Sequence, residues 1–240
     1  GAISDDGSRI FWTAAFGVGP LYVRIDGAET VQIAPANAQF RVASPDGERV
    51  IYSVGKELFE GSVEPGASTS TKIAGEVDGF MGASRDTQLL YLVSQEDLDA
   101  EGPAKAGEHD LYLYRAQEDS FAFIGALSGD DAREVFGSEE SEPTLTPIAR
   151  APFLRSSRIS ADGLYAAFAS SAPLTGYDNT DQPSGRADAE VFLYDAQEDE
   201  LLCASCNPSG ARPHGENRAT AVNPYWAAAT IPGWENQSHA

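Results

Sequence analysis

The chain has 240 residues, with 37 acidic and 16 basic side chains and a formal charge of −21. Hydrophobic residues make up 42% of the sequence, which supplies enough apolar surface for a packed core and argues against intrinsic disorder. The acidic excess argues against a surface that binds the phosphates of DNA or RNA, because such surfaces gather Lys and Arg. No apolar run reaches the roughly 20 residues of a membrane-spanning helix, so the sequence predicts a body that is not embedded in a membrane.

A short motif of serine, one variable residue, aspartate and glycine recurs along the chain. Copies begin at residues 4, 44, 84 and 160, and the third copy ends in Thr87 instead of glycine. Each copy precedes a short run of aromatic and β-branched residues, such as the segment 49–52 with the sequence RVIY. Asp-Gly pairs are typical of tight hairpin turns, and the runs between them predict strands. Because threonine does not favour a left-handed backbone, we expect a wider turn at Thr87.

Four predicted strands in units of about 40 residues are typical of the blades of a β-propeller. The predicted fold is therefore all-β: a β-propeller of four-stranded antiparallel blades, with four blades discernible, forming part of a larger or incompletely closed ring. The blades are expected at about 1–37, 38–77, 78–128 and 157–206, with an inserted loop at 129–156. Residues 207–240 are expected to form an irregular tail that leads toward a further blade. The aromatic residues of one strand in each unit are expected to pack between blades: Trp12, Tyr52, Tyr91, and Tyr165 or Phe168.

The motif SPDG at 44–47, followed by RVIY and a later Leu-Phe strand, resembles the TolB-like β-propeller repeats of bacterial envelope and secreted proteins. The segments 177–181 (YDNTD), 190–195 (EVFLYD) and 203–213 (CASCNPSGARP) are similar to a group of uncharacterised exported bacterial proteins with more blades. The resemblance implies an extracellular, periplasmic or cell-envelope location. It also implies partners that are proteins, peptides or cell-wall glycans. The four units and the tail at 207–240 separately suggest that the remaining blades of a longer chain, or a second copy, complete the ring.

The two cysteines lie three residues apart, as Cys203 and Cys206, and the turn-forming sequence Asn-Pro-Ser-Gly follows them. A thioredoxin-like redox pair would precede a helix, and a structural zinc site would need a second pair of ligands. Two possibilities stay open, a local disulfide in an exported protein and a pair of free thiols.

An acidic loop in the fourth unit offers a candidate calcium site. Asp178, Asn179, Asp181 and Asp188 lie within eleven residues, and calcium takes six to eight oxygen ligands of this kind. The spacing does not match the twelve-residue EF-hand loop. The alternative is that these residues form Asx turns and face solvent. Calcium is the single cofactor that the sequence suggests.

Catalytic motifs are missing from the sequence. It contains no G-x-S-x-G nucleophile elbow and no glycine-rich phosphate loop. His109 begins a predicted strand, so its neighbours Glu108 and Asp110 are expected on the opposite face. We therefore expect a non-enzymatic interaction module, with contact residues in its loops and tail: Tyr177, Tyr225, Trp226 and Trp234. The alternatives are a hydrolase or lyase that acts on polysaccharide through loop carboxylates, and the non-catalytic propeller part of a larger peptidase.

Overall fold

The computed structural model describes residues 1–14, 19–100, 102–105, 107–128, 131, 157–217 and 226–231. In this part of the chain the regular structure is antiparallel β-sheet, so the predicted all-β class is confirmed. The expected loop at 129–156 falls outside the described residues, apart from Asp131. The described residues include no helix long and apolar enough to cross a membrane.

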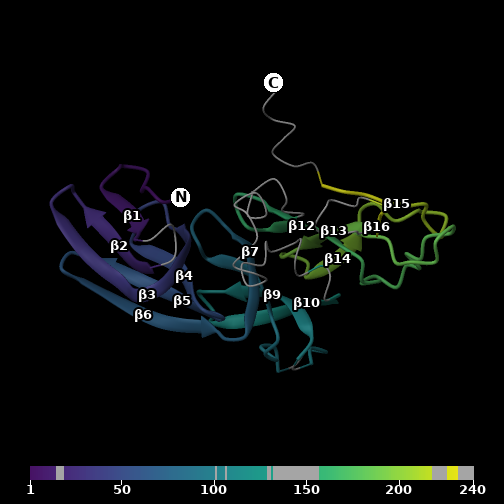
Figure 1. Ribbon diagram of the computed structural model, residues 1–240, viewed down its shortest axis with the longest axis horizontal. Coiled ribbons are helices and arrows are strands. Elements are labelled where there is room, and N and C mark those ends of the chain that lie inside the picture. The colour runs from purple at the N-terminus through teal and green to yellow at the C-terminus, as the bar shows by residue number, and fades with distance from the viewer. Residues whose placement is uncertain are drawn as a thin grey trace, which may run out of the picture.

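Three sheets follow one another in chain order (Figure 1). The first comprises β1 (Arg9–Thr13), β2 (Gly19–Ile25), β3 (Glu29–Ala43), β4 (Arg49–Val54), β5 (Glu57–Glu64) and β6 (Ala67–Ala74). The second comprises β7 (Val77–Ala83), β8 (Leu89–Ser94), β9 (His109–Arg115) and β10 (Ser120–Leu127). The third comprises β11 (Ser157–Ile159), β12 (Tyr165–Ser170), β13 (Glu190–Asp195) and β14 (Glu200–Cys203). A two-stranded ribbon joins β15 (Glu216–Asn217) to β16 (Trp226–Ala227).

The third and fourth repeat units each form a four-stranded sheet, whereas the first two share a strand. The first half of β3 pairs with β2, and its second half pairs with β4. Asn37, with a φ of 52°, lies where the chain passes from one pairing to the other. The first unit has three strands and a single antiparallel bridge from Ile3 to Ile10 where a fourth strand was expected.

The recurring Ser-x-Asp motif builds the same turn four times. The serine hydroxyl donates to Oδ1 of the aspartate at 2.5–2.7 Å. The serine Oγ accepts the amide five residues further on at 2.9–3.0 Å, and the aspartate Oδ1 accepts an amide at 2.9–3.1 Å. Both side chains thus satisfy backbone donors at the entrance to the next strand, which explains why the motif precedes each apolar run.

The turn at Thr87 has the same width as the others, contrary to expectation. Thr87 takes a φ of 61°, close to the 69° of Gly47 in the second copy. Its amide donates to the Ser84 carbonyl at 2.9 Å, and the Gly47 amide donates to the Ser44 carbonyl at the same distance. The hydrogen bonds of Ser84 and Asp86 hold threonine in a conformation that its side chain disfavours.

Replacing Ser44 by alanine is expected to lower the free energy of unfolding by about 1–2 kcal/mol, because the Arg49 amide loses its acceptor. Urea denaturation measures this change. Ser62→Ala is the matched control, since Ser62 is exposed in β5 and its loss should change stability by less than about 0.5 kcal/mol. Equal losses in the two variants would show that the turn contributes nothing specific.

The turn aspartates predict an acid-sensitive fold. Hydrogen bonds from serine hydroxyls and backbone amides hold the pKa values of Asp6, Asp46 and Asp162 below the usual range, that of Asp6 at about 2. A lowered pKa in the folded state contributes stability that is present above the unfolded pKa of about 4 and is lost as the pH falls through the folded value. We expect the urea midpoint to drop between pH 5 and pH 2.5, and to drop less in Asp46→Asn. An identical drop in Asp46→Asn would contradict this origin.

Alternate residues of the second strand pack against different neighbours in the second and third units. In β4, Val50 and Tyr52 join the core shared with β1 and β2, whereas Ile51 joins the core shared with the second sheet. In β8, Leu90 joins that core, and Tyr91 joins the core shared with β12 and β13. The units are therefore stacked in chain order, and each interior unit is buried on both faces.

The two outer faces of the stack are exposed. Trp12 and Ile10 are 45% and 44% exposed on the first unit, and Tyr165 and Leu202 are 40% and 41% exposed on the last. The predicted burial of Tyr52, Tyr91 and Phe168 is confirmed, whereas the predicted burial of Trp12 is wrong. Its side chain lies on the face that no preceding sheet covers in the described part of the chain, where it stacks on Tyr22.

Candidate metal and disulfide site of the fourth unit

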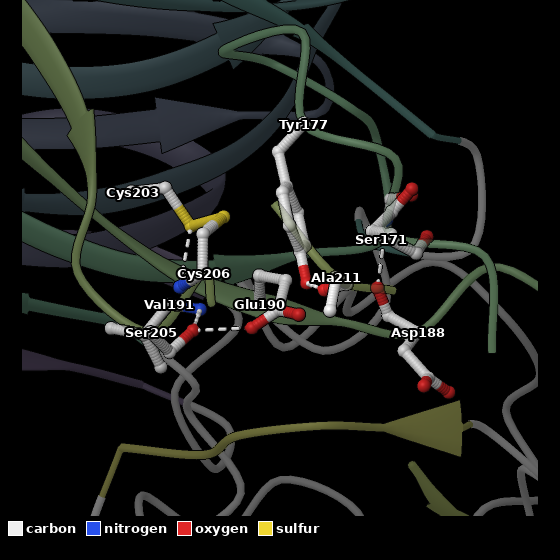
Figure 2. Close-up of a disulfide and its surroundings, with 10 residues drawn as sticks. Ser171, Tyr177, Asp188, Glu190, Val191, Cys203, Ser205, Cys206 and Ala211 are labelled. Carbon is white, nitrogen blue, oxygen red and sulfur yellow. Dashed lines mark hydrogen bonds between the residues drawn. A yellow bond between two sulfur atoms is a disulfide. The ribbon is translucent and has the colours of Figure 1, made fainter. Parts of the chain in front are cut away.

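The loop 171–189 and the segment 207–217 form one hydrogen-bonded region, here called the acidic lobe. Tyr177 donates its hydroxyl to the Ala211 carbonyl at 2.6 Å (Figure 2). The Gln182 amide donates to the Pro213 carbonyl at 3.1 Å. The first part of the predicted tail therefore folds back onto the loop between β12 and β13. Tyr177, a predicted contact residue, is half-buried in this region.

The segment 226–231 also contacts the fourth unit. Ala189 forms a parallel bridge with Ala227, and its amide donates to the Trp226 carbonyl at 2.8 Å. Trp226, another predicted contact residue, is half-buried, and its indole N–H is buried without a hydrogen-bond partner. Tyr225 and Trp234 lie outside the described residues.

Two of the four predicted calcium ligands, Asp178 and Asn179, form hydrogen bonds with the backbone. Asp178 is exposed, and its carboxylate accepts the Thr180 amide at 3.1 Å. Hydrogen bonds from the Thr180 side chain and amide lower the pKa of Asp178. Asn179 is buried and donates its side-chain amide to the carbonyls of Ser171 and Asp188, at 2.7 and 2.8 Å. Asp178 thus forms an Asx turn at the surface, whereas Asn179 joins the backbone at Ser171 to that at Asp188.

Asp181 and Asp188, the other two, are fully buried. Asp181 accepts the amide of Ser184 at 2.6 Å on one oxygen and that of Gly215 at 3.0 Å on the other. Its pKa is lowered, chiefly by the hydrogen bond from Ser184. Neither carboxylate oxygen of Asp188 has a hydrogen-bond partner. Burial, reinforced by the charges of Asp181 and Glu190, raises the pKa of Asp188 to about 6.

Cys203 and Cys206 are joined by a disulfide, with their Cα atoms 5.5 Å apart. Ser205, inside this loop, donates to the buried Glu190 carboxylate at 2.5 Å and accepts the Val191 amide at 2.8 Å (Figure 2). The disulfide loop is thereby attached to the start of β13. Among the described residues, one group of three potential metal ligands lies close together, namely Glu190, Cys203 and Cys206. Its sulfur atoms are bonded to each other, so they offer no thiolate to a metal.

A second polar cluster lies between the second and third units. Asp78 accepts hydrogen bonds from Lys56 at 3.4 Å, Gln95 at 2.9 Å and His109 at 2.5 Å. It borders a cavity of about 80 Å³, which Arg41 and other residues of the second unit also line. Within the described part of the chain, no hydroxyl or thiol is hydrogen-bonded to His109. Asp78 thus brings together a lysine, a glutamine and a histidine at this cavity.

Sequence reasoning did not predict the burial or half-burial of three acids. Asp78 pairs with His109 across 31 positions, a separation that no local motif reports. Asp131 accepts the hydroxyls of Ser170 and Ser171, at 2.6 and 2.9 Å. Asp110 is fully buried, with its pKa raised by burial. The burial of Asp110 could have been predicted from its place at the start of an apolar strand. Glu190 has the same place in another strand.

No family model and no curated protein matches the chain. Similar solved structures include a protein described as TolB from Agrobacterium tumefaciens, with 18% identity over 84% of this chain and a TM-score of 0.42. TolB from Acinetobacter baumannii has 12% identity over 88% of this chain and a TM-score of 0.37. The tricorn protease also has 12% identity over 88% of this chain, with a TM-score of 0.47. The chain spans 62%, 56% and 18% of these three proteins, respectively. TolB proteins are thus among the structures that the chain resembles, as the sequence motifs indicated.

Proposed function

We propose that this chain is a β-propeller-type module of an exported protein, and that it binds a protein, a peptide or a cell-wall glycan without catalysing a reaction. The observation that carries this proposal is the stacking of the four units, in which alternate residues of β4 and β8 pack against the preceding and the following unit. Such stacking makes a rigid scaffold that presents its loops in fixed positions.

Two further observations support the proposal. The disulfide between Cys203 and Cys206 is typical of proteins that leave the reducing cytosol. The acidic lobe is held by backbone and side-chain hydrogen bonds, among them those of Tyr177 and Gln182. A preformed loop loses less conformational entropy on binding a ligand than a disordered one does.

Binding and turnover can be measured side by side. The purified chain is incubated with cell-wall sacculi, a set of soluble glycans and a displayed peptide library, while the release of reducing sugar and of peptide products is followed. We expect saturable binding to one of these ligand classes and no product. The polysaccharide hydrolase or lyase would be favoured instead if product forms, if Asp181→Asn abolishes its formation and if Asp178→Asn does not. Absence of binding to every class would refute the proposal.

The exposed outer faces of the stack suggest where further blades would pack. Trp12 and Ile10 on the first unit and Leu202 on the last are apolar, as are the residues that fill the interior interfaces. We propose that blades of a longer chain or a second copy cover these faces. If a second copy does so, sedimentation velocity should show concentration-dependent association that Trp12→Glu weakens. Thr69→Glu on the exposed strand β6 is the control, and a wild-type monomer at all concentrations would exclude the second copy.

A further inference from the structure

Two buried carboxylates meet at one glycine of the acidic lobe. Oδ1 of Asp181 accepts the Gly215 amide at 3.0 Å. The carboxylate of Asp188 lies so close to Gly215 that an added Cβ at this position would collide with it. The site therefore joins three segments: the loop through Asp181, the residues before β13 through Asp188, and the segment 207–217 through Gly215.

Asp188 is the unusual member of this pair. Its side chain is fully buried, and both of its oxygens lack a hydrogen-bond partner. The charged groups that face it are Asp181 and Glu190, which are anionic, and the exposed His214. Figure 2 shows the Glu190 carboxylate directed toward Ser205 and that of Asp188 directed away from the disulfide. A buried anion beside further anions is strongly unfavourable unless a proton or a cation neutralises it.

We propose that Asp181 and Asp188 bind a divalent cation, calcium in particular, and that this cation fixes the acidic lobe to the fourth sheet. The donors are carboxylate oxygens, which suit a hard ion, and two carboxylates neutralise its double charge. The oxygens of Asp181 each accept one amide hydrogen bond, which leaves a lone pair on each for a metal. The ligand set does not include Asp178, which is exposed, or Asn179, whose NH2 group is hydrogen-bonded to the carbonyls of Ser171 and Asp188.

The cation would act as a cross-link whose loss frees the segment 207–217. Without it, the repulsion between Asp181 and Asp188 opposes the closed arrangement, and the hydrogen bond from Gly215 is the first contact to open. The inference does not depend on the proposed binding function, because it concerns the stability of the lobe itself.

The test is a calcium titration of the chelator-treated protein, followed by calorimetry and by thermal melting. We expect one ion per chain, and a melting temperature that rises by about 5–10 °C at a calcium concentration a hundredfold above the dissociation constant. Asp188→Asn should abolish the calcium response and should melt at a higher temperature than the wild type in chelator, because it removes the unpaired charge. Asp178→Asn is the matched control and should respond as the wild type does. Gly215→Ala should weaken binding without removing a ligand.

Hydrogen exchange of the wild-type protein keeps the proposal testable even if the Asp188 variant fails to fold. The peptide that covers 207–217 should exchange more slowly with calcium than with chelator, while peptides from β4 and β8 should not change. The proposal would be overturned if calcium, magnesium, manganese and zinc all leave the melting temperature and the exchange pattern unchanged. It would also be overturned if Asp188→Asn binds calcium as the wild type does.

Discussion

Replacing Phe192 by alanine is expected to lower the free energy of unfolding by about 3–5 kcal/mol. Phe192 is 1% exposed in β13, and its ring stacks on Phe168 of the neighbouring strand with centroids 5.8 Å apart. Both rings belong to the core that the third and fourth units share, together with Tyr91 and Leu113. Alanine would leave a cavity there, since the flanking sheets are fixed by their own hydrogen-bonded strands and cannot close around it.

The control for this experiment is Leu202→Ala on the adjacent strand β14. Leu202 belongs to the same sheet but is 41% exposed on its outer face, so its loss should cost less than about 1 kcal/mol in urea denaturation. The difference between the two variants measures how much of the stability resides between the units. Equal losses would contradict the stacked arrangement, because they would mean that both faces of the fourth sheet are covered alike.

The strands and turns of this fold could be predicted because their causes are local. The hydroxyl of Ser44 and the carboxylate of Asp46 satisfy backbone donors within five residues, so the motif by itself marks a turn. The apolar run after each turn then has two neighbours to pack against, which explains why Val50, Ile51 and Tyr52 are all buried. The expectation that threonine would widen the turn was wrong at Thr87. Threonine keeps the left-handed backbone there because the turn has the same hydrogen bonds as the other copies.

The candidate site could be predicted only in part, because its decisive contacts are not local. The acidic loop was visible in the sequence, but which of its four residues are buried depends on the segment 207–217. Gly215 contacts both Asp181 and Asp188, and nothing in its neighbourhood in the sequence indicates this. In the same way, Asp78 meets His109 only because β7 and β9 belong to one sheet. Burial of a charged group is a property of the assembled sheets, which composition and spacing do not report.

Removing the disulfide is expected to destabilise the chain by about 2–3 kcal/mol. In the chain-entropy account, a bond that closes so short a loop contributes about 2 kcal/mol, and Cys203 and Cys206 are three residues apart. A further loss comes from Ser205, whose hydrogen bonds to Glu190 and Val191 depend on the shape of that loop. Glu190 is 1% exposed, so a weakened hydrogen bond leaves a buried carboxylate poorly compensated.

The measurement is the urea midpoint of the wild type with and without a thiol reductant, compared with that of the double variant Cys203→Ser, Cys206→Ser. The reductant should lower the midpoint of the wild type and should leave the double variant unchanged, because the variant has no disulfide to lose. Ser205→Ala in the oxidised protein isolates the contribution of the hydrogen bond to Glu190, since the covalent link stays intact. If reduced and oxidised wild type unfold at the same urea concentration, the disulfide does not stabilise this loop. Hydrogen bonds would then hold the loop to β13 without it, among them the bond from the Ala204 amide to the Val191 carbonyl at 2.8 Å.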